Sequence, residues 1–476
     1  GDVYGWGQNA YGQIGDGFKE GWIIPNLSPV LRGKNITMVS AGAEHSIAIS
    51  KEGAVFAWGR NHNGQLGLSD AAYADCVHPE LQNNCQGDRK SEAIWPSGVA
   101  RLWGEHVLQV SSMWDHNLAV TRSGNTYAWG NNEMGQLGTG DTTGRNVPTK
   151  IKDAESYRFI LVAVGGLHSM GLDSWGKVFV WGSGSEGQLG QDTHGLGPRS
   201  AGARRALAPI EVPLLGAKRV VQIAAGWAHC IAITDTGDVW VWGSNDYGQL
   251  GLGDRADRFM PHLLQAPGAG DGSKVGRVVR ASAGHGHSVW LSDLGHVFSA
   301  GRNDGGQLGV GDSIDRAGVQ AVTVPLRVWC DTPFGSEISQ GYADWVCVGS
   351  AVRNNCGTRC KGIQRRQDCG PSNVTVGLVT ADCEPLMPIS NFGIDVQCGE
   401  YTSFMISDDH NLYAWGANTD GQIGIGPPEL WGKFVTKPRL VLSTYGKNVT
   451  SVTGGRFHTV ARTDREYMFI LDFSPA

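Results

Sequence analysis

Histidine recurs in this chain at one fixed place in a repeated pattern, 13 residues before a Trp-Gly pair or its equivalent. The members are His45, His116, His168, His229, His287 and His458, the last without a following Trp-Gly, and Thr402 occupies the place once. Histidines that converge within a few ångströms can bind a metal or act as general bases. A role repeated in every copy is explained better by a structural hydrogen bond between neighbouring strands. We therefore expect no catalytic, metal or cofactor site and no enzymatic activity.

Cysteine is the second reactive residue type, with 10 copies. Eight lie in two interruptions of the repeat, a short one around residues 70–94 and a long one over residues 325–387. They are Cys76 and Cys85 in the first, and Cys330, Cys347, Cys356, Cys360, Cys369 and Cys383 in the second. Even groups of cysteines in loops predict disulfides, whose pairing the sequence leaves open. A zinc knuckle at Cys356 and Cys360 is the alternative.

Arginines accompany the cysteines of the long insertion. The set is Arg353, Arg359, Arg365 and Arg366, with Trp345 nearby. The stretch NNCGTRCKGIQRRQDC resembles a thrombospondin type 1 repeat, although the family's W-x-x-W tryptophan pair is missing, Lys361 replaces its usual glycine and the order of the cysteines is unusual. The resemblance implies stacked arginine and tryptophan side chains that bind a partner such as an anionic glycan. The alternative is a basic loop whose arginines are solvated.

Three Asn-x-Thr sequons begin at Asn35, Asn373 and Asn448. Asn35 and Asn448 each lie 10 residues before a repeat histidine, at a position that we expect to face solvent. Such triplets also arise by chance and in turns. Together with the grouped cysteines, they predict a glycosylated protein of the secretory pathway, located outside the cell or at its surface.

The repeat itself predicts the elements that hold these residues. Ser46 begins an alternating run, Gly53 lies in a turn, and a second alternating run ends at Trp58, a pattern typical of antiparallel hairpins. Gly-Gln-Leu/Ile-Gly begins six residues after each Trp position. The Trp positions are Trp6, Trp58, Trp129, Trp181, Trp242, Ala300 and Trp415. Small sheets repeated in this way are stable when they stack around an axis.

Seven Trp positions and seven His-type positions predict an all-β, seven-bladed β-propeller closed by strands from both termini. The expected parts are first blades at residues 1–324, a cysteine-rich insertion between two blades at residues 325–388, and last blades at residues 389–476 that close the ring with residues 1–15. The chain begins at Gly1, so we expect a processed or trimmed chain. A net charge of -6 argues against nucleic-acid binding, and the lack of a long apolar run argues against membrane insertion.

The repeated G-x-x-H-S, W-G and N-x-x-G-Q-L-G pattern resembles that of the regulator of chromosome condensation family, over nearly all of the chain outside the long insertion. The resemblance implies a seven-bladed propeller. It implies no single function, because founding members are exchange factors for a small nuclear GTPase, bacterial relatives inhibit enzymes and others are modules of large proteins.

The two insertions direct our functional hypothesis. We expect both to leave the same type of inter-blade connection and so to emerge on one face as the contact surface. The chain is then a non-enzymatic extracellular binding or structural assembly module, which binds a protein partner, itself or an anionic glycan. One alternative is an intracellular exchange factor or regulator of a small GTPase. Another is a secreted inhibitor of an enzyme.

Overall fold

The chain divides into two compact units, Gly1–Thr323 with Phe392–Ala476, and Val324–Asn391. The computed structural model describes residues 1–68, 91–191, 205–215, 218–265, 276–322, 392–426 and 433–464, and five short strands between residues 346 and 378. Among these residues, no helix has the length and apolar character needed to cross a membrane.

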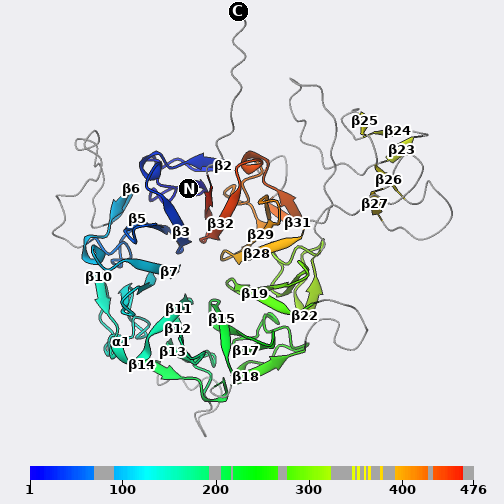
Figure 1. Ribbon diagram of the computed structural model, residues 1–476. Helices are drawn as coiled ribbons and strands as arrows, with labels where there is room; N and C mark the ends of the chain where they lie inside the picture. Colours follow the sequence, from blue (N-terminus) through cyan, green and yellow to red (C-terminus); the bar gives the residue numbers. More distant parts are fainter. Residues whose placement is uncertain are drawn as a thin grey trace, which may run out of the picture. The chain divides into compact units, whose positions relative to one another are not determined.

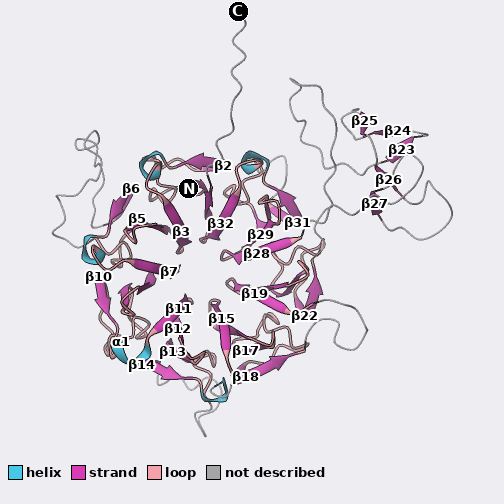
Figure 2. Ribbon diagram, viewed as in Figure 1, coloured by secondary structure: helices cyan, strands magenta, loops and turns pink. Residues whose placement is uncertain are grey.

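The larger unit is a ring of seven four-stranded antiparallel sheets, which confirms the expected all-β, seven-bladed propeller (Figures 1 and 2). The innermost strands are β3 (Ile36–Ala41), β7 (Val107–Met113), β11 (Phe159–Val164), β15 (Val220–Ala225), β19 (Val278–Ala283), β28 (Gly393–Cys398) and β32 (Val449–Gly454). The second strands are β4 (His45–Ser50), β8 (His116–Thr121), β12 (His168–Asp173), β16 (His229–Thr234), β20 (His287–Ser292), β29 (Thr402–Ser407) and β33 (His458–Thr463).

The two outer positions of each blade follow the same plan. The third strands are β5 (Val55–Arg60), β9 (Thr126–Gly130), β13 (Val178–Ser183), β17 (Val239–Gly243), β21 (Val297–Gly301), β30 (Leu412–Ala417) and β1 (Asp2–Gly7). The outermost strands are β6 (Glu92–Gly98), β10 (Arg145–Lys150), β14 (Arg205–Glu211), β18 (Arg258–Leu264), β22 (Arg316–Ala321), β31 (Phe434–Leu440) and β2 (Trp22–Leu27). We number the blades 1 to 7 in this order.

In the part of the chain that the structure describes, helix occurs only as single turns. They are η1 (Pro29–Leu31), η3 (Ala100–Leu102), η4 (Pro213–Leu215), η6 (Leu442–Thr444) and α1 (Ala154–Tyr157), and each lies between an outermost strand and the next innermost strand. The smaller unit contains β23 (Val346–Val348), β24 (Ala351–Arg353), β25 (Arg359–Cys360), β26 (Ile363–Arg365) and β27 (Val376–Leu378).

Both ends of the chain build blade 7, whose strand order is β2-β1-β33-β32. β1 pairs with β33 along six residues, from Asp2 opposite Thr463 to Gly7 opposite His458. The predicted closure by strands from both termini is confirmed. Because the two ends pair with each other, neither leaves an open sheet edge within the blade.

Strand direction gives the ring two distinct faces. Innermost and third strands both run toward the face that carries the G-x-x-His loops and the Gly-Gln-Leu-Gly loops, which we call the loop face. The opposite face carries the hairpin turns and the connections between blades, and we call it the turn face. Residues 69–90 interrupt the loop between β5 and β6, whereas residues 323–391 connect β22 to β28.

The expectation that both insertions leave the same type of inter-blade connection is therefore wrong. Residues 69–90 are inserted within a blade, between two strands whose joined ends lie on the loop face, whereas residues 323–391 join two blades whose connected strand ends lie on the turn face. Distances between Trp positions do not distinguish these cases, because either insertion lengthens the interval in the same way.

The conserved tryptophan of each repeat binds the preceding blade. Its indole N–H donates to the backbone carbonyl of the Gln in the Gly-Gln-Leu/Ile-Gly loop, which lies in a different blade. Trp6, Trp58, Trp129, Trp181, Trp242 and Trp415 donate to Gln422, Gln13, Gln65, Gln136, Gln188 and Gln307 over 2.8 to 3.0 Å. All six indoles are fully buried. In blade 5, Ala300 holds this place and buried Trp290 packs toward Gly251.

The same carbonyl accepts a second hydrogen bond, and this bond gives the histidines their role. Ser46 donates its hydroxyl hydrogen to the Gln13 carbonyl over 2.8 Å, so its oxygen must accept from His458 Nε2 at 2.9 Å. The same relay runs from His116 to Ser169, from His229 to Ser288 and from His287 to Ser403. The predicted structural role of the repeat histidines is confirmed. Each one ties its own blade to the next.

Two other side chains substitute for the serine, and one junction lacks the relay. Asn117 accepts from His45 at 2.7 Å and donates to the Gln65 carbonyl. Cys230 occupies the place opposite His168 at 3.1 Å. At Thr402 no imidazole is present, and Thr459 still donates to the Gln422 carbonyl over 2.8 Å.

Burial keeps the relay histidines neutral. Desolvation lowers the pKa of His116, His229, His287 and His458 to about 3 and that of His168 to about 4, and it lowers the pKa of His45 as well. The Nδ1 atoms of these rings have no hydrogen-bond partner. A second ring proton would therefore be buried without an acceptor, which is costly.

We predict that acid unfolds the propeller through these histidines. Their pKa is depressed in the folded state, so the unfolded chain binds more protons between about pH 6.5 and the folded values, and stability falls as the pH drops through that window. Each relay histidine contributes up to about 1.4 kcal/mol per pH unit. Denaturant unfolding measured between about pH 7.5 and about pH 4.5 tests this. His458→Gln should lower the slope of the unfolding free energy against pH by up to about 1.4 kcal/mol per pH unit. An unchanged slope would contradict the prediction.

Candidate functional site

The G-x-x-His loops meet at the centre of the loop face and hold one another through backbone hydrogen bonds. The Ala43 N–H donates to the Trp114 carbonyl over 3.0 Å, and the Arg456 N–H donates to the Ala43 carbonyl over 3.1 Å. Further round the ring, the His285 N–H donates to the Glu400 carbonyl over 3.0 Å. Neighbouring blades thus fix the positions from which the loop side chains project.

Two tryptophans from blades 2 and 4 meet across blade 3. The ring centroids of Trp114 and Trp227 lie 4.7 Å apart in an edge-to-face arrangement. Blade 3 contributes Gly166 between them, and a Cβ at Gly166 would lie 2.5 Å from the Trp227 ring. The glycine therefore makes the room that Trp227 occupies. Edge-to-face contact is a favoured geometry for aromatic pairs.

Aromatic side chains continue from Trp227 round the centre of the ring. Trp227 stacks on His285 with centroids 5.0 Å apart, and His285 stacks on Tyr401 at 5.6 Å. Tyr401 is followed by Phe457 at 6.5 Å. All five rings come from the two variable positions of G-x-x-His loops, and all five are partly exposed. They form a continuous apolar surface that solvent reaches.

Two arginines lie against these rings. The guanidinium carbon of Arg456 is 5.4 Å from the Trp114 centroid and 5.0 Å from that of Phe457. The guanidinium of Arg302 is 5.4 Å from the Tyr401 centroid. We call this set the central cluster, and its members are Trp114, Trp227, His285, Tyr401, Phe457, Arg302 and Arg456. Stacking of this kind is worth about 0.5–2 kcal/mol per pair, depending on exposure.

The two arginines differ in their acidic partners. Arg302 Nε donates to Asp304 Oδ1 over 2.9 Å. Arg456 has the carboxylate of Glu400 at 3.8 Å, and its buried Nε makes no hydrogen bond. Burial raises the pKa of Glu400 above its usual value. Arg456 therefore makes weaker contacts with acidic groups than Arg302 does. Its guanidinium can still donate hydrogen bonds to an anionic or carbonyl group of a partner.

Proton chemistry is unfavourable at the central cluster. Burial, with smaller contributions from Arg302 and Arg456, lowers the pKa of His285 to about 4. Burial and the adjacent Glu400 raise the pKa of Tyr401 to about 12. Both groups are therefore neutral near pH 7 and far from the range where a general acid or base works well. The surface suits recognition rather than catalysis.

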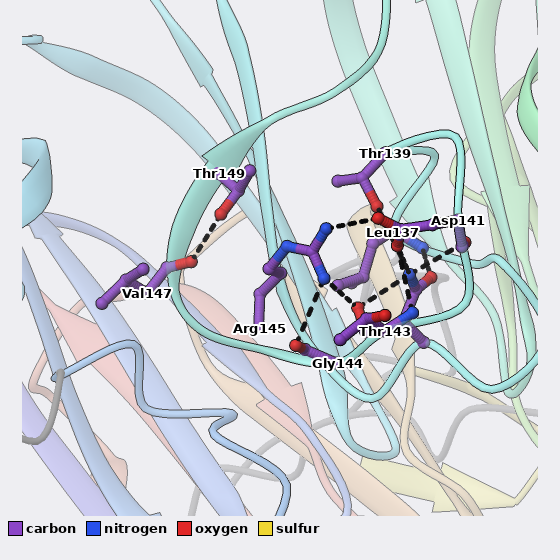
Figure 3. Close-up of polar contacts among 9 residues, drawn as sticks. Leu137, Thr139, Asp141, Thr143, Gly144, Arg145, Val147 and Thr149 are labelled. Atoms are coloured by element: carbon purple, nitrogen blue, oxygen red, sulfur yellow. Dashed lines mark hydrogen bonds and ion pairs between the residues drawn. The ribbon is translucent and has the colours of Figure 1, made fainter.

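The outer loops of the loop face are stabilised by a repeated Asn-Asp-Arg arrangement (Figure 3). Asn132 accepts the Leu137 N–H over 2.9 Å and donates to the Asp141 and Thr143 carbonyls. Arg145 pairs with Asp141 at 2.6 Å, and this bond lowers the pKa of that carboxyl group. The same pairs recur at Asp254–Arg258 and Asp312–Arg316. These bonds fix the shape of each outer loop.

The cysteine–histidine contact inside the propeller is not an activated nucleophile. Burial raises the pKa of Cys230 well above its usual value and lowers that of His168 to about 4, so neither ion forms readily. Cys230 and Cys398 are free cysteines. Within the described part of the chain, no group of three or more His, Cys, Asp or Glu side chains is placed to hold a metal.

Most residues that the sequence singled out lie outside the described residues, so their roles stay predictions. They are Cys76, Cys85, Cys330, Cys356, Cys369, Cys383, Asn373, Trp345 and Arg366. Cys347, Cys360, Arg353, Arg359 and Arg365 lie in the short strands of the smaller unit. There the backbone places Arg353 opposite Arg359.

Asn35 and Asn448 have a conformational role that the sequence did not reveal. Both have positive φ, 51° and 48°, and so do His106 and Arg158 at the equivalent repeat position. Asn35 is exposed and Asn448 is partly exposed. Asparagine tolerates the left-handed region better than most residues, which accounts for its presence before the innermost strand without any sugar.

Sequence reasoning missed the central cluster because its members stand at the least regular positions of the repeat. The two residues between Gly and His change from blade to blade, and they include Trp114, Trp227, Tyr401 and Phe457. One feature of the sequence could have indicated this site. The Gly and His positions of the repeat hardly change between blades, whereas large aromatic residues occur at the two positions between them.

Comparison with known proteins identifies the repeat. The family model for the regulator of chromosome condensation (RCC1) repeat matches residues 1–49, 52–120, 123–172, 176–233, 236–291 and 409–462. The Arabidopsis thaliana ultraviolet-B receptor UVR8 is 32% identical over 66% of this chain and 64% of its own length. The Homo sapiens E3 ubiquitin-protein ligase HERC2 is 33% identical over 60% of this chain and 5% of its own. The mitochondrial RCC1 domain-containing protein RUG3 of Arabidopsis thaliana is 30% identical over 53% and 63%.

Solved structures share the fold. Human WBSCR16 superposes with a TM-score of 0.69 at 21% identity, covering 98% of this chain and 100% of that protein. Prp20p from Saccharomyces cerevisiae gives 0.67 at 22% identity, covering 98% and 92%. This chain spans less than two thirds of the length of each of the three sequence relatives.

These relatives correct the expected location and function. The relatives are a photoreceptor, a ubiquitin ligase and a mitochondrial protein, which act inside cells. The expected extracellular location and the extracellular binding or assembly function are therefore wrong, and the comparisons give no support to the glycoprotein assignment. Binding of an anionic glycan and self-assembly outside the cell have no support in the comparisons either. The relatives include both a receptor and a ligase, so the repeat itself does not decide enzymatic activity.

We predict that Gly166→Ala disrupts the central cluster without unfolding the ring. The new Cβ displaces Trp227 from its contact with Trp114, at a cost of about 1–3 kcal/mol, as is typical for overpacking. Near-UV circular dichroism should lose part of its tryptophan signal, and thermal unfolding should occur at a lower temperature. Gly318→Ala is the matched control, because a Cβ at Gly318 meets no atom within 4 Å. Equal spectra for the two variants would contradict this account of the cluster.

Proposed function

Because the chain belongs to the regulator of chromosome condensation (RCC1) repeat family, we propose that it is a non-enzymatic intracellular protein that binds a protein partner and regulates a small GTPase. The observation that carries the proposal is the central cluster. It combines aromatic and arginine side chains on a rigid ring of loops, and its histidine and tyrosine are both neutral near pH 7.

The composition of the central cluster suits a protein interface. Tryptophan, tyrosine and arginine are the residues that most often dominate binding energy at such interfaces. Trp114 and Arg456 are partly exposed and already stacked, so little side-chain freedom remains to be lost on binding. The backbone bonds between neighbouring loops keep this surface in place before a partner arrives.

Relatives support a protein partner. Prp20p of Saccharomyces cerevisiae, which shares the fold, is described by its binding to Gsp1p and histones, and yeast RCC1 is also known bound to Kap60. The family resemblance adds exchange-factor activity toward a small nuclear GTPase. We therefore propose that this chain regulates a small GTPase.

Reception of ultraviolet-B light is a second candidate, favoured by one observation. The relative UVR8 is an ultraviolet-B receptor, and in this chain Trp114 and Trp227 form a close indole pair beside Arg456. Indole absorbs ultraviolet light. Irradiation should then change the near-UV dichroism of the wild type and not that of Trp227→Phe, whereas equal responses would exclude this role.

The proposed function is tested by nucleotide release from a panel of small GTPases that begins with yeast Gsp1p. The chain should bind one member and accelerate release of fluorescent GDP from it. Arg456→Ala and Trp114→Ala should weaken binding by about 30-fold, equivalent to the ~2 kcal/mol typical of a central anchor residue.

The matched control is Trp103→Ala, because Trp103 is 52% exposed and lies beside η3 on the turn face. This variant should retain wild-type affinity and release rates. Failure of every GTPase to bind would refute the proposal. Equal losses of affinity in Trp103→Ala and Trp114→Ala would instead indicate that the partner binds outside the central cluster.

A further inference from the structure

A β-bulge recurs in every innermost strand. In β7 the pairing passes from Val107 opposite Thr121 to Gln109 opposite Val120, so Leu108 has no partner of its own. The same shift occurs in the other six blades. The skipped residues are Thr37, Leu108, Ile160, Val221, Val279, Ile394 and Thr450. A bulge turns the side chain of the extra residue away from the regular pleat.

Five successive blades place an apolar residue at this bulge. They are Leu108, Ile160, Val221, Val279 and Ile394, in blades 2 to 6, and we call them the apolar arc. Four of them are substantially exposed, with fractions of 52% for Leu108, 53% for Ile160, 45% for Val221 and 41% for Ile394. Single exposed aliphatic residues are ordinary, but a row repeated at one structural place indicates a surface that another segment covers.

The arc is held in a fixed geometry on the turn face. The residue after the bulge bonds to the next innermost strand: Gln109 donates to the Val162 carbonyl over 2.8 Å and accepts the Val162 N–H over 2.8 Å. Gln222 makes the same pair of bonds with Ala281. The innermost strands that carry these residues lie around the inner edge of the ring (Figure 1).

The chain leaves the propeller beside one end of this arc. Val449 pairs with Thr463, and the Asp464 N–H donates to the Asn448 carbonyl over 3.0 Å, so β33 ends on the turn face next to Thr450. Residues 465–476 follow, with the sequence REYMFILDFSPA. In residues 467–473, six of the seven side chains are apolar. Twelve residues reach at most about 40 Å when extended, enough to cross several blades.

We propose that residues 467–473 cover the apolar arc. The two surfaces match in character, since one is a row of aliphatic side chains and the other a run of aromatic and aliphatic ones. They are also tethered: a segment joined to the ring by a few residues is present at an effective concentration near the millimolar range. The proposal concerns the turn face and does not depend on the function proposed for the loop face.

Limited proteolysis of the full chain tests this proposal. Chymotrypsin cuts after exposed aromatic residues, so its cleavage at Tyr467, Phe469 and Phe473 reports how often the segment is uncovered. Ile160→Asp and Val221→Asp place a charge in the arc and should each accelerate cleavage about tenfold or more. Thr37→Asp is the matched control, because it adds the same charge at the same bulge outside the arc. Its cleavage rate should stay at the wild-type value.

A second measurement tests whether residues 467–473, and not a second copy of the chain, cover the apolar arc. A chain that ends at Asp464 keeps every described strand. A fluorescent peptide of residues 465–476 should bind this shortened chain saturably. It should bind the shortened chain carrying Ile160→Asp at least tenfold more weakly. Equal cleavage in all variants, or no binding of the peptide, would overturn the proposal. So would a concentration-dependent dimer of the full chain that Ile160→Asp abolishes, because a second copy would then occupy the arc.

Discussion

One backbone carbonyl per repeat is the constraint on which the ring depends. At a complete junction the Gln carbonyl of a Gly-Gln-Leu/Ile-Gly loop accepts an indole N–H and a hydroxyl hydrogen from the following blade, as Gln13 does from Trp58 and Ser46. Because the hydroxyl gives away its only hydrogen, its oxygen is left to accept one from a histidine. Three residue types therefore act together at such a junction, and the blades are joined by directed bonds as well as by apolar packing.

This mutual requirement explains why the fold was predictable. A residue that serves a junction appears in nearly every copy at the same spacing, so the sequence reveals the number of blades, their order and the role of the histidines. Exceptions are equally informative: Asn117 replaces the serine with an amide that both accepts and donates. Ala300 loses the indole, and Trp290 fills that part of the core.

The functional surface was less predictable for the opposite reason. Trp114, Trp227 and Arg456 lie at positions where the repeat requires no particular residue type. The periodicity of the sequence therefore gives no information about them. Their significance comes from proximity between blades 2, 4 and 7, which only the ring geometry supplies. Asn35 shows that one residue can fit two explanations, because it matches a modification motif and also has a left-handed backbone that asparagine tolerates.

The pairing of β1 with β33 has a consequence for synthesis of the protein. Asp2 is opposite Thr463, so β1 cannot pair with this neighbour until residue 463 has been synthesised. Until then blades 1 to 6 form an open crescent whose two ends lack a junction partner. Ring closure therefore follows the synthesis of all seven blades and has a long loop to close, and a chain that lacks either strand exposes unpaired strand edges to chaperones and proteases.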